Sequence, residues 1–170
     1  MSILSRKKFI ATLTGASAMI ALPQLLKSQP PPQLPTKGDP LDKELVKKFV
    51  GAAHKDFGQV KTMLQETPDL LNSVNNLGGW DWEDALGAAG HVGIRDMALF
   101  LLQQGARPTI CVAAMLGELA LVQSFITAFP HMKDAVGPHK ISLMRHAIAG
   151  GEPAKAVVDY LVSIGAKEKT

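Results

Sequence analysis

Apolar residues recur at helical spacing along most of the chain, and small or turn-forming residues interrupt them at related positions. A small-residue pair begins a segment at Ala52, Ala89 and Ala113, and a looser copy begins at Ala147. In the first three copies Asp or Gly follows, and apolar residues at intervals of three and four come next. This pattern predicts a first helix, a stop, and a second helix with one buried stripe. The sequence therefore predicts about four helix–turn–helix repeats.

Helix-ending residues mark the limits of these repeats. Asp56, Gly93 and Gly117 are placed to take the left-handed conformation that stops each first helix. The first helix of the series is expected to begin at Asp39–Asp42, with Asp39 as its cap and Pro40 in its first position. The second helices are expected to end at Gly105-Ala106 and Gly165-Ala166, or at Pro68 and Pro130.

The fullest copy spans residues 86–106, where Leu86, Ala89, Gly93, Leu101, Leu102, Gly105 and Ala106 fall in register. It resembles the ankyrin repeat, although no copy has the family's Thr-Pro and first His. The resemblance covers residues 41–166 and implies an all-α, short, irregular ankyrin-like solenoid. Irregularity follows from the unequal spacing of the copies, with a long loop around Asn75–Glu83 and a short connection before Ala113. The alternative, a tetratricopeptide-type solenoid, would lack the Gly-Ala ends.

The N-terminal residues 1–27 are typical of an export signal. Basic residues at 6–8 precede an apolar stretch that is shorter than the ~20 residues of a membrane span. Ser5, Arg6 and Phe9 resemble the twin-arginine export motif, and Lys7 stands where that motif has its second arginine. We expect export to the periplasm or cell envelope, with the segment either cleaved or kept as an anchor. The alternative is an N-terminal helix of a cytoplasmic protein.

A proline-rich linker separates this segment from the repeats. Residues 28–40 contain five prolines, which predicts an extended, semi-rigid connection. The repeat domain then covers residues 41–166, and residues 167–170 form a tail.

The net charge of +3 does not indicate a nucleic-acid partner. The excess comes from the basic residues at 6–8, and the rest of the chain is balanced. Phosphate binding requires clustered cations, so nucleic-acid binding is not expected. The chain is 46% hydrophobic and 19% charged, which is a globular composition. Its single cysteine, Cys111, lies in an apolar run and is expected to be buried.

The long loop holds both tryptophans and several acids. Trp80 and Trp82 favour a partner-binding finger, because tryptophan is common in interface hot spots. The other interpretation is that a ring covers the core, and Trp82, which borders the next helix, is the ring expected to pack. Asp81 and Glu83 could serve acid–base chemistry, but helix capping is the favoured interpretation because no nucleophile accompanies them.

The five histidines show no metal-ligand spacing on one helix, so no metal or cofactor is expected. His54 and His91 are expected at exposed ends of first helices, and His139 in a turn at Gly137–Lys140 between the third and fourth repeats. Val92, Met115 and Leu116 could form an apolar strip on the concave face. The candidate partner-binding residues outside the Trp loop are therefore His54, His91, Val92, Met115, Leu116 and His139.

The ankyrin resemblance implies a non-catalytic, monomeric scaffold that binds a protein partner through its concave face and inter-repeat loops. Contact with a membrane is expected only through the N-terminal segment. Two alternatives remain at this point: an immunity-type inhibitor of a secreted protein, and an enzyme that uses the acidic Trp loop.

Overall fold

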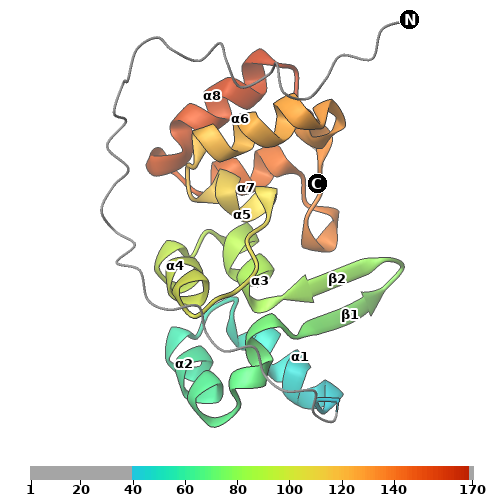
Figure 1. Ribbon diagram of the computed structural model, residues 1–170, viewed down its shortest axis with the longest axis vertical. Coiled ribbons are helices and arrows are strands. Elements are labelled where there is room, and N and C mark those ends of the chain that lie inside the picture. Colours follow the sequence, from blue (N-terminus) through green and yellow to red (C-terminus); the bar gives the residue numbers. More distant parts are fainter. Residues whose placement is uncertain (1–39, 169–170) are drawn as a thin grey trace, which may run out of the picture. The chain divides into compact units, whose positions relative to one another are not determined.

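The computed structural model describes residues 40–168 of the chain, so the predicted signal with Ser5, Arg6, Lys7 and Phe9, and nearly all of the linker, lie outside the described residues. The described part is mostly helical, in agreement with the sequence (Figure 1). Its elements are α1 (Lys43–Ala52), α2 (Phe57–Glu66), η2 (Pro68–Asn72), β1 (Val74–Gly78), β2 (Asp81–Asp84), α3 (Ala85–Val92), α4 (Arg95–Gln103), α5 (Ile110–Met115), α6 (Leu119–Ala128), η3 (Pro130–Asp134), η4 (Pro138–Lys140), α7 (Leu143–Ala149), η5 (Glu152–Ala154) and α8 (Lys155–Ser163).

The α-helices follow one another as antiparallel pairs. The first helices α1, α3, α5 and α7 pack against one another in chain order, and each second helix packs against the first helix of its own pair (Figure 1). Because α5 is short, α3 also contacts α7. The predicted series of helix–turn–helix units is therefore present over residues 43–163.

The long loop expected at Asn75–Glu83 is a β-hairpin instead. β1 and β2 pair antiparallel, with Val74 opposite Asp84 and an irregularity between Asn76 and Gly78. The turn residues Gly79 and Trp80 have φ of 57° and 66°. Such left-handed pairs match the twist of two-residue hairpins. The sequence hides this hairpin because its strands carry no alternating apolar pattern.

Two helix starts differ from the prediction. The side chain of Asp42 accepts a hydrogen bond from the backbone N–H of Leu45, so Asp42 is the cap of α1, and the predicted cap Asp39 lies outside the described residues. Asp56, predicted as a left-handed stop, has φ of −123° and caps α2 through the N–H of Gln59. An aspartate can accept these bonds, which explains why it begins a helix here and does not end one.

The glycine stops are confirmed. Gly93 and Gly117 have φ of 82° and 77°, and both end first helices. A Cβ at Gly93 would collide with the backbone carbonyl of Ala149, and one at Gly117 with that of Pro153. These glycines therefore serve two purposes, because they reverse the chain and let a later segment approach the backbone.

The hydrophobic core has two parts, one in the first two helix pairs and one in the last two, and α5 contributes side chains to both. Cys111 is buried, as predicted, and burial raises its thiol pKa to about 12. The predicted apolar strip is wrong for Met115 and Leu116, which are 0% and 6% exposed. α5 lies between α3 and α7, so its side chains are enclosed. Val92, by contrast, is exposed.

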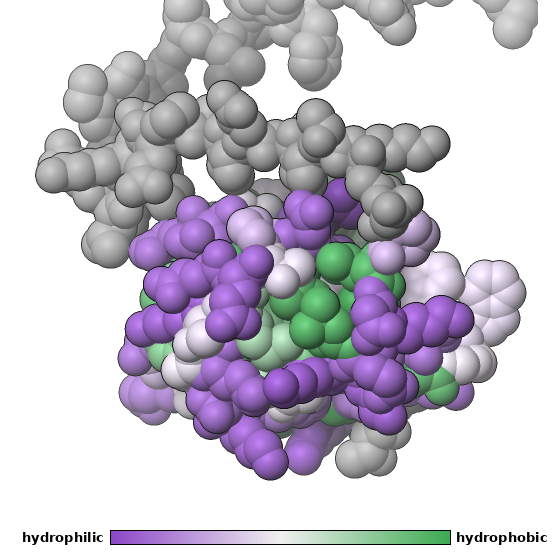
Figure 2. Space-filling view, turned by 90° about the horizontal axis from the view of Figure 1, so that it is seen from below, coloured by the Kyte–Doolittle hydropathy of each residue, from purple (hydrophilic) through white to green (hydrophobic). Residues whose placement is uncertain are grey.

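The end of the stack formed by the first helix pair has a hydrophobic area within a hydrophilic surround (Figure 2). Leu41, Leu45, Phe57 and Leu71 in this part of the chain are only partly buried. Among the described residues this helix pair has a neighbouring pair on one side only, which accounts for the exposure. Within the described residues, no helix is long and apolar enough to cross a membrane.

Gly93→Ala should lower the free energy of unfolding by about 3 kcal/mol, because strain at positive φ adds to the collision with the Ala149 carbonyl. Gly165→Ala is the matched control: Gly165 has φ of 68°, but a Cβ there meets nothing within 4 Å, so a loss of about 1 kcal/mol is expected. Urea denaturation measures both values. Equal losses would contradict the packing role of Gly93.

Candidate metal centre

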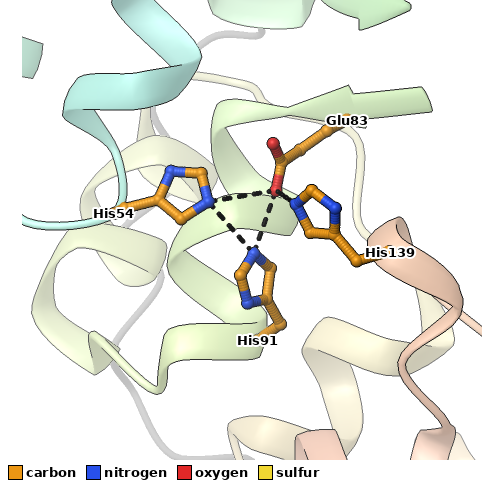
Figure 3. Close-up of side chains that lie close together, drawn as sticks. All are labelled: His54, Glu83, His91 and His139. Carbon is orange, nitrogen blue, oxygen red and sulfur yellow. Dashed lines mark hydrogen bonds and ion pairs between the residues drawn. The ribbon is translucent and has the colours of Figure 1, made fainter. Parts of the chain in front are cut away.

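Four side chains from separate elements meet beside the hairpin (Figure 3). They are His54, which follows α1, Glu83 on β2, His91 on α3 and His139 in η4. One ligand atom from each lies within 4.8 Å of the others.

Several interatomic distances within this cluster are close to those between ligands of one metal ion. Oε1 of Glu83 lies 3.2 Å from Nε2 of His54, 2.9 Å from Nε2 of His91 and 3.1 Å from Nε2 of His139. The Nε2 atoms of His54 and His91 are 3.2 Å apart. Ligands at zinc–ligand distances around a tetrahedral ion are about 3.3 Å apart. These four separations are therefore close to those between the ligands of a tetrahedral ion.

A backbone contact fixes the orientation of the His54 ring. Its Nδ1 lies 3.0 Å from the carbonyl oxygen of Val50, so Nδ1 carries the hydrogen and donates it. In the neutral ring, Nε2 is then a bare lone pair that points toward Glu83 and His91. Histidine ligands of metals commonly have this arrangement, in which the outer nitrogen donates to a carbonyl or carboxylate.

His139 is held by Asp81 and by an unusual backbone conformation. The N–H of His139 donates to Oδ1 of Asp81 at 2.9 Å, and Nδ1 lies 3.9 Å from Oδ2. Both His139 and Lys140 have φ of 58°, which is uncommon outside glycine. A backbone bond from Gly137 to the Ile141 carbonyl closes the turn, which confirms the turn predicted at Gly137–Lys140.

Glu83 is the buried member of the cluster, at 3% exposure. Burial acts to raise the pKa of its carboxyl group. The hydrogen bond with His91 and the charge of the neighbouring histidines outweigh burial and lower that pKa overall. Glu83 is therefore present as a carboxylate, the form in which it binds cations.

Hydrogen bonds alone do not account for the number of ring nitrogens around Oε1 of Glu83. A carboxylate oxygen has about two lone pairs, whereas three ring nitrogens lie within 3.2 Å of Oε1 of Glu83. A single cation between the four atoms accepts all four lone pairs at once. The arrangement therefore suits a metal ion better than a set of direct bonds.

Two features border the cluster. His146 is fully buried with its ring centre 6.5 Å from that of His91, and its Nε2 has no partner among the described residues. A pocket of about 300 Å³ reaches His91 between Ile141, Ile148 and Arg145, but none of the other three cluster residues lines it. Arg145 in that pocket pairs with Glu168 at 2.9 Å.

The structure places the predicted site residues of the loop in different surroundings. Trp80 is 93% exposed, and Trp82, predicted to pack, is 57% exposed, so that prediction is wrong. Neither Asp81 nor Glu83 caps a helix, because Asp84 caps α3 through the N–H of Gly87. The side chains of Asp81 and Glu83 point toward the histidines instead, as the hydrogen bonds of both residues show.

His54 and His91 are not the exposed residues that the sequence suggested. Their side chains are 30% and 11% exposed. One signal in the sequence does connect them, since each directly follows the small-residue pair of its repeat. Stacked repeats place equivalent positions side by side. A search for ligand spacing on a single helix cannot find a pair of this kind.

Comparison with models of known protein families finds no match, and no curated protein matches the chain significantly.

His146 should make the fold sensitive to acid. Burial lowers its pKa from the usual 6.5, so below that pH the unfolded chain binds a proton that the folded chain does not bind. The free energy of unfolding should therefore fall as the pH drops through 6.5 toward the lowered pKa of the folded state. His146→Asn, whose amide nitrogen takes the place of Nδ1 and can still donate to the Ser142 carbonyl, should reduce this fall when chelator is present. His131→Asn at an exposed position is the control and should keep it.

Proposed function

We propose that this protein binds one divalent transition-metal ion, with His54, Glu83, His91 and His139 as its ligands. Three imidazole nitrogens and one carboxylate oxygen form a donor set that suits Zn²⁺. The observation that carries the proposal is the convergence of three Nε2 atoms on the single Oε1 of Glu83.

The number of protein ligands favours a structural role for this ion. Catalytic zinc sites keep one position for water or substrate, whereas structural sites are closed by four protein ligands. Here Oε1 of Glu83 lies within 3.2 Å of three ring nitrogens, and Glu83 is buried, although the His139 side chain is 42% exposed. This supports a protein without catalytic activity, in which the ion joins segments that are distant in the sequence.

Isothermal titration of the metal-free protein with Zn²⁺ should show one ion per chain. His91→Ala removes the ligand closest to Glu83 and should weaken binding by about 100-fold or more, since one of the four proposed coordinate bonds is lost. His131→Ala removes a histidine outside the cluster and should leave the affinity unchanged. Equal effects of the two variants would contradict the proposed ligand set.

Co²⁺ in place of Zn²⁺ should give the strong visible absorption of a tetrahedral complex.

A specific observation also supports the second candidate function, a protein-binding scaffold of ankyrin-like type in the cell envelope. Trp80 is 93% exposed and has φ of 66° at a turn position that suits glycine. Neither the exposure nor the conformation benefits the fold. A residue whose exposure and backbone conformation lower the stability of the fold is a candidate for binding. An exposed tryptophan is also a common interface anchor.

Trp80→Gly tests this second function. Glycine relieves the strain at positive φ but adds freedom to the unfolded chain, so the free energy of unfolding should change by less than about 1 kcal/mol. Capture of a partner by tagged protein from native envelope extracts should be lost. Leu99→Ala on α4, a surface change away from the hairpin, is the control and should retain capture. Retained capture by Trp80→Gly would exclude Trp80 as the anchor.

A further inference from the structure

We infer that the metal ion attaches the β1–β2 hairpin to the helical body, so that the position of Trp80 depends on whether the ion is bound. This inference rests on the proposed metal binding and concerns how that site controls its surroundings.

The hairpin has little of its own to hold it in place. Two-stranded hairpins are at best marginally stable in water without further packing. Of the strand residues in 74–78 and 81–84, Glu83 is the one buried side chain, and the apolar residues Val74, Leu77 and Trp82 are exposed. No buried apolar side chain therefore holds the hairpin in place. The one buried side chain of its strands, Glu83, is a proposed metal ligand.

The neighbours of the hairpin carry the other ligands. β1 lies against α1, which His54 follows, and β2 lies against η4, which contains His139. The bond from the His139 N–H to Asp81 is a second link between the hairpin and η4. At its base, Asp84 joins the hairpin to α3 as a helix cap. Beyond that base, polar contacts with cluster residues hold the hairpin to the body.

Without an ion, these contacts compete with one another. Three ring nitrogens approach one carboxylate oxygen, and the His54 ring already donates through Nδ1 to Val50. Oε1 has about two lone pairs, so it cannot accept a full hydrogen bond from all three rings at once. The left-handed backbone of His139 and Lys140 adds a cost that the metal-free turn can relieve by moving. Opening of the hairpin and η4 removes both costs while the helix pairs stay packed.

Hydrogen exchange measured by mass spectrometry tests this inference on the full chain, with Zn²⁺ or with chelator. With Zn²⁺ at about 100 times its dissociation constant, opening that releases the ion becomes about 100-fold rarer. Exchange of amides in residues 74–84 should slow by about that factor. Residues 110–128 in α5 and α6 contribute no ligand and should change little.

Glu83→Ala separates attachment of the hairpin from metal binding. Three histidines still hold the ion, with reduced affinity, but the hairpin loses its own ligand and keeps only the Asp81–His139 hydrogen bond near the site. At saturating Zn²⁺ this variant should show fast exchange in residues 74–84. Both tryptophans lie in the hairpin, so Zn²⁺ should raise the tryptophan fluorescence anisotropy of wild type and not that of the variant.

The outcomes distinguish the two proposals. If titration shows no metal binding, the proposed function fails and this inference fails with it. If Zn²⁺ binds but exchange in residues 74–84 is unchanged, or slows equally in residues 110–128, the inference is overturned while metal binding stands. Protection by Zn²⁺ that is confined to the hairpin and η4, and is lost from the hairpin in Glu83→Ala, supports it.

Discussion

The burial of one carboxylate is the constraint on which this part of the molecule depends. Glu83 is 3% exposed, and its Oε1 lies beside three imidazole nitrogens. A buried charge is strongly unfavourable unless it is paired or coordinates a metal. The end of α1, the end of α3 and the η4 turn each supply one histidine to this carboxylate. The positions of these three segments and of the hairpin are therefore linked through one oxygen atom.

The unusual backbone conformations occur around the same place. The non-glycine residues with positive φ in residues 40–168 are Trp80, His139 and Lys140. Two of them belong to the turn that presents a ligand, and the third is at the tip of the hairpin that carries Glu83. The helix pairs, by contrast, place glycine at their positive-φ stops, as at Gly93 and Gly117. Strain is thus concentrated where the proposed metal and the exposed tryptophan lie, which is typical of functional segments.

A metal centre and a binding hairpin are compatible with one protein. Repeat proteins bind partners through segments that project from a stack whose own stability comes from neighbouring repeats. Here the stack positions His54 and His91 at equivalent places in two repeats, and the hairpin is an insertion between those repeats. Because the insertion buries no apolar side chain, its attachment has to come from polar contacts or from an ion. The inserted segment supplies Glu83, one of the four proposed metal ligands.

The sequence alone determined the features that depend on local pattern. Apolar spacing predicts the helix pairs, Gly93 and Gly117 predict the stops, and the apolar run around Cys111 predicts its burial. Helical periodicity and positive φ involve residues a few positions apart, so a sequence displays them directly. The cluster joins residues that are up to 85 positions apart, from His54 to His139. The tertiary structure brings these side chains together, because the stacked helices place His54 and His91 side by side and the hairpin and η4 add Glu83 and His139. Each ligand alone looks like an ordinary polar residue of a strand, turn or helix end.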